Sequence, residues 1–233
     1  MYGPELFQLI SKTAPKDTLV VLDLDSTLFN VGARTQALAV DFANNSSNQF
    51  KFPEECELLK NIQVNARHWG IAEPIAELKI RSEILFFDAV ITHWQKYFFS
   101  NKFLKHDILS KGSQNFISSL LNRGNTIHYL TGRDTVRMGE GTVESLKLNK
   151  LPLDSTHKLF MKPIKGINDV EHKREQIKEF AKSFSNIWMI DNEPTILLDL
   201  EKTCPDVNLV FMNTVHSKKA ESPLHMYTLD GHF

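Results

Sequence analysis

The sequence predicts an α/β fold, in which an open, doubly wound parallel sheet carries an inserted helical subdomain. Two observations lead to this fold class. Short apolar runs alternate with segments that have the pattern of helices over most of the chain. The interval between the first run and residue 112 breaks this alternation and contains no convincing strand.

The strands are predicted from runs that are short, unalternating and rich in branched or aromatic residues. This composition is typical of strands that are buried on both faces of a parallel sheet. In chain order the runs are residues 19–25, 126–131, 158–163, 186–191 and 208–213, of which 158–163 is the weakest.

Helix-like segments lie between the later strands. They are residues 112–124, 141–149, 171–184 and 193–202. Strands and helices that alternate at this spacing form right-handed βαβ units, so we expect a Rossmann-like, doubly wound sheet.

The interval after the first strand is predicted to be a separate helical unit. A polar stretch at 44–53 divides it. Beyond that stretch, apolar residues recur at helical steps, and we expect this face to pack the unit's own core. These residues are Ile84, Phe87, Ile91, Trp94 and Phe98. We therefore predict an α/β core of residues 1–29 and 106–233, with residues 30–105 as a helical insert.

The composition excludes several classes of protein. A formal net charge of −1, without a basic stripe, argues against a polymer of nucleic acid as partner. No apolar stretch approaches the length of about 18 residues that marks a membrane helix, and the N-terminus does not resemble a secretory signal. The two cysteines, Cys56 and Cys204, are expected to be reduced. We expect a cytoplasmic protein, and the sequence does not indicate its oligomeric state.

Acidic residues follow two of the predicted strands. Asp23 and Asp25 lie at the end of the first strand and point to the same side, because side chains alternate along an extended segment. Thr131 ends the second strand, and Asp191 ends a later one. Ligands of doubly wound sheets bind beyond the carboxyl ends of the strands. Carboxylates gathered there, without paired thiols or histidines, favour Mg²⁺ over zinc.

The motifs D-L-D-S-T and T-G-R, a lysine at a helix start and an apolar strand that ends in aspartate occur in this order. This ordered set resembles the haloacid dehalogenase superfamily of phosphotransferases, in its phosphatase branch, where a helical cap lies between the first and second motifs. The resemblance covers nearly the whole chain apart from the insert, which would be the cap.

The resemblance implies a role for each motif. Asp23 would be the nucleophile that forms an aspartyl-phosphate. Asp25 would protonate the leaving oxygen and then deprotonate the attacking water. Thr131 and the backbone N–H of Gly132 would hold the phosphoryl group, and Thr27 would brace the loop. Mg²⁺ would be bound by the Asp23 carboxylate, the Asp25 backbone carbonyl and Asp191.

Two positions of the pattern stay open. Lys173 suits the family's spacing for a lysine that binds the phosphate, with Lys162 and Lys178 as rivals. The aspartate motif continues as Asn192 and Glu193, and either side chain could complete the metal shell. Glu193 could equally be an acid that favours the start of a helix.

The expected function is Mg²⁺-dependent hydrolysis of a small phosphorylated metabolite, because a covered site admits small molecules. The alternatives are a phosphotransferase or phosphomutase of the same family, a phospho-acceptor signalling module and a non-catalytic binding module. Arg133 and Asp134 are expected to brace the T-G-R loop. Conceivable substrate contacts in the cap are Arg67, His68, Arg81 and His93.

Overall fold

The computed structural model describes residues 1–78, 80 and 84–233, and its centre is a six-stranded sheet. The strand order is β5-β4-β1-β6-β7-β8, and all neighbouring strands are parallel. The strands are β1 (Thr18–Leu22), β4 (Thr126–Asp134), β5 (Lys158–Lys162), β6 (Asn186–Asp191), β7 (Asn208–Met212) and β8 (Tyr227–Leu229). The predicted doubly wound fold is confirmed.

Strand β1 lies between β4 and β6, and all five of its residues are buried. Leu22 at its carboxyl end is in register with Tyr129 of β4 and with Ile190 of β6. The segments that follow these three strands therefore leave the sheet next to one another. This is the point where the strand order reverses direction, which is where doubly wound sheets bind ligands.

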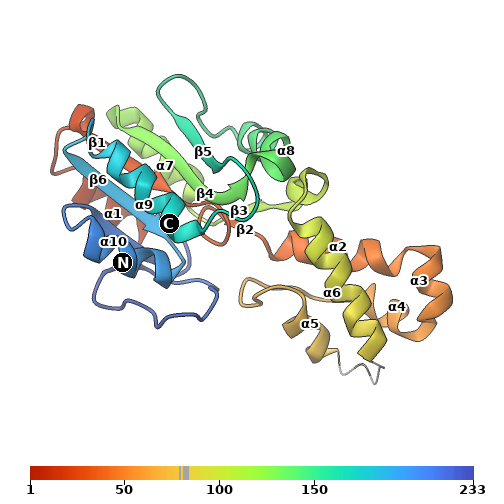
Figure 1. Cartoon of the computed structure of the whole chain (residues 1–233). Helices are drawn as coiled ribbons and strands as arrows, with labels where there is room; N and C mark the ends of the chain where they lie inside the picture. The colour runs from red at the N-terminus through yellow and green to blue at the C-terminus, as the bar shows by residue number, and fades with distance from the viewer. Residues whose placement is uncertain (79, 81–83) are drawn as a thin grey trace.

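Helices cover both faces of the sheet (Figure 1). They are α1 (Gly3–Ile10), α7 (Ser113–Arg123), α8 (Thr135–Leu148), α9 (Asp169–Phe180) and α10 (Pro194–Thr203), with a short 3-10 turn, η1 (Pro15–Asp17). Residues of α1, α7 and α8 share a hydrophobic cluster with Val20 and Leu22, whereas residues of α9 and α10 share another with Leu19 and Val21. The alternating side chains of β1 thus supply both cores.

A second group of helices stands to one side of the sheet (Figure 1) and has a hydrophobic cluster of its own. These helices are α2 (Gly32–Ala43), α3 (Ser46–Lys51), α4 (Pro53–Leu59), α5 (Ala72–Glu77) and α6 (Ile84–Phe98). The 3-10 segment η2 (Asn101–His106) leads back and packs on α8. At the base, β2 (Phe29–Asn30) and β3 (Ile108–Leu109) pair antiparallel, so the outgoing and returning chains are joined. We call residues 30–106 the cap.

The structure differs from the sequence expectations in two parts of the cap. Residues 46–51 of the polar stretch 44–53 form α3, because the side chain of Asn45, the residue before the helix, accepts hydrogen bonds from the N–H groups of Ser47 and Asn48. In α6 the fully buried residues are Phe86 and Val90 rather than the predicted stripe. Phe87, Ile91 and Trp94 of that stripe are partly buried against the same cluster.

Four short elements were not predicted: helix α1 of the core, the paired strands β2 and β3 at the base of the cap, and the edge strand β8. Within the part of the chain that the structure describes, no helix combines the length and the apolar character needed to cross a membrane.

Candidate active site

Asp23 and Asp25 lie in a tight turn that follows β1. The N–H of Asp23 donates to the carbonyl of Ile190, which continues the pairing with β6. Two residues later the chain reverses, because Ser26 adopts a left-handed conformation with φ 59° and the N–H of Phe29 donates to the Leu24 carbonyl. The buried strand therefore fixes the position of Asp23, and the turn points Asp25 toward the base of the cap.

Lys173 joins the carboxylates at the ends of β1 and β6. It lies in the second turn of α9, which Asn168 caps through the N–H groups of Val170 and Glu171. Its ammonium is 2.6 Å from Asp23 Oδ1 and 2.7 Å from Asp191 Oδ2. All three side chains are buried.

The rival lysines lie elsewhere. The ammonium of Lys162 donates to Asp169 Oδ1 at 2.5 Å and to the Ile167 carbonyl at 3.1 Å. Lys178 lies on the exposed side of α9, where it contacts Glu175. Of the three candidates, Lys173 is the lysine that faces Asp23.

The cluster of Asp23, Asp191 and Lys173 carries an excess of negative charge. Burial raises the pKa of Asp23 to about 7, and the attraction of Lys173 only partly opposes this because Asp191 lies beside it. Burial also raises the pKa of Asp191. Although burial disfavours its charge, Lys173 has a pKa above its usual value because the carboxylates of Asp191 and Asp23 stabilise the ammonium. A further positive charge would therefore be favourable here.

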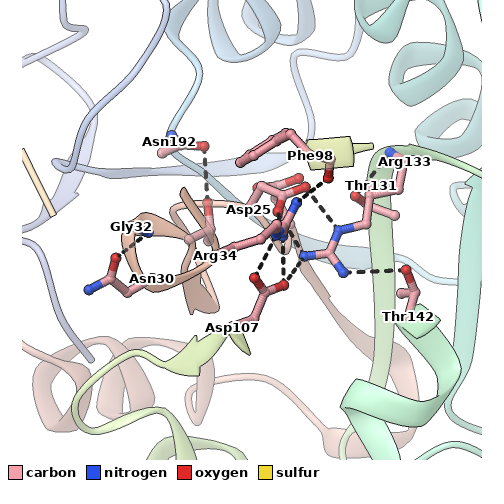
Figure 2. Close-up of polar contacts among 12 residues, drawn as sticks. Asp25, Asn30, Gly32, Arg34, Phe98, Asp107, Thr131, Arg133, Thr142 and Asn192 are labelled. Carbon is pink, nitrogen blue, oxygen red and sulfur yellow. Dashed lines mark hydrogen bonds and ion pairs between the residues drawn. The ribbon is translucent and has the colours of Figure 1, made fainter. Parts of the chain in front are cut away.

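Asp25 belongs to a separate ionic network, which Figure 2 shows. Arg133 donates two hydrogen bonds to Asp25, from Nε to Oδ2 at 2.9 Å and from NH2 to Oδ1 at 2.7 Å. Arg34 of α2 donates to the same Oδ1 at 2.6 Å. Asp107 bridges the two guanidinium groups, at 2.6 Å from Arg34 and 2.7 Å from Arg133. Two acids and two arginines from four segments thus form one closed group.

This network fixes the ionisation of Asp25. Burial disfavours its charge, but Arg133 and Arg34 outweigh that effect and hold the pKa of the Asp25 carboxyl well below its usual range. Asp25 is therefore an ionised carboxylate with both oxygens engaged. To donate a proton it must first be released from at least one arginine.

Sequence reasoning did not find Arg34 or Asp107. Arg34 has no exposed surface and lies within an ordinary helical segment, and Asp107 has no motif around it. A fully buried arginine requires a carboxylate partner, but the linear pattern does not mark Arg34 as buried.

The T-G-R residues lie at the carboxyl end of β4, the strand that pairs with β1. Thr131 is buried, and its hydroxyl accepts a hydrogen bond from the N–H of Arg133 at 3.3 Å. A Cβ on Gly132 would lie 3.0 Å from the carboxylate of Asp169, so the position is crowded for a larger residue. Asp134 does not pair with Arg133; its side chain accepts from the N–H of Arg137 and caps α8.

The residues after Asp191 brace a neighbouring loop. Asn192 accepts a hydrogen bond from the Thr27 hydroxyl at 3.2 Å and donates to the Val215 carbonyl at 2.6 Å. Glu193 accepts from the N–H and the hydroxyl of Ser217, at 3.1 and 2.7 Å. Both side chains are thus engaged in holding protein segments together.

A cavity of about 260 Å³ opens above these residues, between the sheet and the cap. Its core side includes Asp23, Asp25, Thr131, Gly132, Lys173 and Asp191. Its cap side is formed by Val31, Thr35, His68, Trp69, Gly70, Trp94, Phe98 and Phe99. Of the cap residues considered as substrate contacts, His68 lines the cavity, whereas His93 pairs with Asp41. Arg81 lies outside the described residues.

The possible metal ligands are few. Among the described residues, no three acidic, histidine or cysteine side chains gather in a way that could hold a metal ion. Asp23 and Asp191 remain as two neighbouring carboxylates, because the arginines hold the side chain of Asp25. Two carboxylates with a backbone carbonyl suit Mg²⁺, which retains several of its waters.

Comparison with known proteins identifies the fold. No family model and no curated protein matches the chain. Among solved structures, a candidate haloacid dehalogenase-like hydrolase from Burkholderia xenovorans matches with a TM-score of 0.52 and 15% identity, over 93% of each chain. A candidate phosphatase from Clostridium difficile matches with a TM-score of 0.51 and 14% identity, over 86% of each chain.

A third solved structure is similar to the chain in fold, again at low sequence identity. A haloacid dehalogenase-superfamily hydrolase of subfamily IA from Geobacter sulfurreducens has a TM-score of 0.50 and 12% identity, over 87% of this chain and 91% of its own. At these identities the likeness concerns the fold, which is the capped α/β fold that the motifs predict.

Proposed function

We propose that this chain, whose fold is that of the haloacid dehalogenase-like hydrolases, is a Mg²⁺-dependent phosphatase of small phosphate monoesters that acts through an aspartyl-phosphate. One observation carries the proposal. Asp23, at the carboxyl end of the central strand, faces a cavity floor on which Lys173 bridges it to Asp191. This arrangement offers a nucleophile beside a fixed positive charge, as transfer of an anionic phosphoryl group requires.

In the first step, an oxygen of the Asp23 carboxylate attacks phosphorus, and the bond from phosphorus to the ester oxygen breaks. Lys173, the hydroxyl of Thr131 and the N–H of Gly132 stabilise the negative charge on the phosphoryl oxygens. In the second step water attacks the aspartyl-phosphate, which releases phosphate and restores the carboxylate. Burial of Asp23 limits the access of bulk water to the phosphoryl group that it would carry.

Mg²⁺ would be held by the carboxylates of Asp23 and Asp191 and by the backbone carbonyl of Asp25. When bound, it would supply the positive charge that Lys173 alone leaves incomplete, and it would orient the phosphate. The raised pKa values of the two buried carboxyls support this assignment, because a cation between them favours their ionised forms.

Asp25 is proposed to move the proton, and its contacts define when it can do so. As an ionised carboxylate it can accept a proton from the attacking water of the second step. To protonate a leaving oxygen in the first step, it must be released from an arginine and must already carry a proton, which is the one that it took from the attacking water in the preceding turnover. Arg34 is the candidate to move, because it belongs to the cap helix α2, whereas Arg133 belongs to the sheet.

Release of phosphate from 4-nitrophenyl phosphate in the presence of Mg²⁺ tests the proposal. Asp23→Asn, which keeps the shape of the side chain but removes the nucleophile, should abolish turnover, and so should an excess of EDTA. Asp17→Asn, at an exposed position in η1, is the matched control and should keep full activity. Substantial turnover in EDTA, or an Asp23→Asn protein as active as wild type, would refute the proposal.

A further inference from the structure

The cap side of the cavity is an aromatic wall. Trp69, Trp94, Phe98 and Phe99 all line it. Two of them keep much of their surface uncovered, because Trp69 is 48% exposed and Phe99 is 38% exposed. Large aromatic side chains that remain uncovered inside a cavity are favourable contact surface for a ligand.

The wall is held in place before any ligand arrives. The indole N–H of Trp94 donates to the Thr35 hydroxyl at 3.1 Å, which sets the orientation of the ring. The ring centroid of Phe98 lies 4.6 Å from that of Trp94 and 5.0 Å from that of Phe99. Gly70 packs on the opposite edge, where a Cβ would lie 3.4 Å from the Trp94 ring.

Trp69 is presented by a loop that is tied to α5. Its N–H donates to Glu73 at 2.5 Å, and the neighbouring His68 is buried, with one ring nitrogen 3.0 Å from Glu77. Gly70 follows with φ +82°, a backbone conformation that favours glycine. These contacts place the Trp69 ring at the mouth of the cavity.

The polar groups on the cap side already have partners within the protein. Thr35 accepts from Trp94, and the two nitrogens of His68 contact the Asn65 N–H and Glu77. Among the residues that the structure describes, no lysine or arginine of the cap lines the cavity. On the core side, the ammonium of Lys173 already bridges two carboxylates. The guanidinium of Arg133, which also lines the cavity, is paired with Asp25 and Asp107. A substrate with a second anionic group, or with many hydroxyls, would thus lose hydration without gaining partners.

We propose that the cavity selects phosphate monoesters whose leaving group carries an uncharged aromatic ring, which stacks against Trp69 and Trp94 while the phosphate lies at Asp23. This inference rests on the proposed phosphatase function and names its substrate class. The ring could belong to a nucleoside 5′-monophosphate or to a simpler aryl or arylalkyl ester, since the chemistry at the wall is the same.

Benzyl phosphate and n-propyl phosphate provide the sharpest comparison. Both esters carry the same charge and release a primary alcohol, but only one has a ring. We expect kcat/KM for benzyl phosphate to be about tenfold higher or more, as aromatic contact and apolar burial together suggest. Adenosine 5′-monophosphate and phenyl phosphate, measured in parallel, distinguish the two sources of the ring. Equal kcat/KM for the benzyl and propyl esters would overturn the inference.

Two variants locate the effect. Trp69→Ala should lower the benzyl-to-propyl ratio severalfold. Phe50→Ala removes an aromatic ring that is 92% exposed on cap helix α3, outside the cavity, and should leave the ratio unchanged. An unchanged ratio in Trp69→Ala would contradict the assignment of the wall.

Binding can be measured without turnover. The chain has three tryptophans, of which Trp69 and Trp94 line the cavity, whereas Trp188 lies in β6. Benzylphosphonate should change the tryptophan fluorescence at lower concentration than propylphosphonate does. If all esters are hydrolysed without preference, this inference fails but the proposed function stands. If no ester is hydrolysed and neither phosphonate binds, both fail.

Discussion

At the scale of single residues, Lys173 is the group that makes two buried carboxylates tolerable. Its ammonium lies within 2.7 Å of an oxygen from each of Asp23 and Asp191. Removing one partner from a buried ionic group costs much more than a surface contact is worth, because the remaining charge stays buried without compensation. The same ammonium is proposed to bind the phosphoryl group, so stability and activity depend on one atom.

Replacing this lysine should therefore affect both properties. Lys173→Met should abolish turnover and lower the free energy of unfolding by about 3–5 kcal/mol. Lys162→Met is the matched comparison, because that ammonium contacts Asp169 and not Asp23. It should retain most of the activity. Urea unfolding and phosphate release test both variants, and greater loss of activity in Lys162→Met would reverse the assignment.

Unlike the charge of Lys173, the charge of Asp23 destabilises the folded protein. Its folded-state pKa is raised by burial, so its contribution to stability is complete below the unfolded pKa of about 4 and is lost as the pH rises through about 7. Asp23→Asn removes this loss. In EDTA at pH 8 the inactive variant should melt a few degrees higher than wild type, and the difference should shrink at pH 4.5.

Mg²⁺ provides the control for this prediction. The ion should raise the melting temperature of wild type more than that of Asp23→Asn, because the variant lacks one of the proposed carboxylate ligands. An Asp23→Asn protein that melts below wild type at pH 8 in EDTA would show that the buried charge is not destabilising.

At the scale of elements, the ionic network ties the cap to the sheet. Arg34 comes from α2, Arg133 from β4, Asp25 from the turn after β1 and Asp107 from the segment that returns from η2. Arg34 also donates to the carbonyl of Phe98 at the end of α6. The proposed proton-transfer group is therefore bound to the same residues that anchor the two ends of the cap.

Arg34→Met should show how much this network contributes to stability. It leaves Asp25 and Asp107 with one arginine between them and should lower the free energy of unfolding at pH 7 by about 3–5 kcal/mol. Arg174→Met, which removes a partly exposed pair with Asp199, should cost much less. Chemical denaturation of both variants tests the difference.

The network also predicts a dependence on pH. The folded-state pKa of Asp25 is held below its usual value, so its stabilising contribution is complete above the unfolded pKa of about 4 and is lost as the pH falls. Wild type should therefore lose stability below pH 4 more steeply than Arg34→Met, in which that pKa is less depressed. Equal slopes in acid would argue against the ion pair.

At the scale of the whole molecule, a second ion pair joins the cap to the core, beside the loop that carries Trp69. The ammonium of Lys218, in the loop after β7, lies 3.1 Å from Glu73 of α5. Both side chains are exposed, so the pair adds little to stability. Its position near Trp69 suggests an effect on how closely the cap covers a substrate.

Reversing the charge of Lys218 should loosen the contact between the cap and the core and so weaken substrate binding. Lys218→Glu should raise KM for the benzyl ester about 2–5-fold and leave the melting temperature within a degree or two, as expected for an exposed pair. Lys218→Arg keeps the positive charge and leaves the contact of Glu73 with the Trp69 N–H in place, so it should keep the wild-type KM. A KM in Lys218→Glu no higher than in Lys218→Arg would show that the pair does not act across the cavity.

The sequence predicted those features that depend on local pattern. The strands of the core and the fold class follow from apolar runs, and Lys173 follows from its place at the start of a helix. The network around Asp25 could not be predicted, since Arg34 and Asp107 are brought to it by tertiary contacts alone. In α6 the apolar arc is wider than the predicted stripe, so periodicity did not reveal that Phe86 and Val90 are the buried pair.

The placement of β1 also determines the order in which the active site can be assembled. Leu19 pairs with Thr126 of β4 and with Ile187 of β6, both of which come much later in the chain. The contact order of the core is therefore high, whereas the cap helices pack on one another within a shorter stretch of the chain. During synthesis Asp23 emerges early, but the strand before it does not have both of its neighbours until β6 is made. Catalytic activity should return only in the last phase of refolding, after the helical signal of the cap.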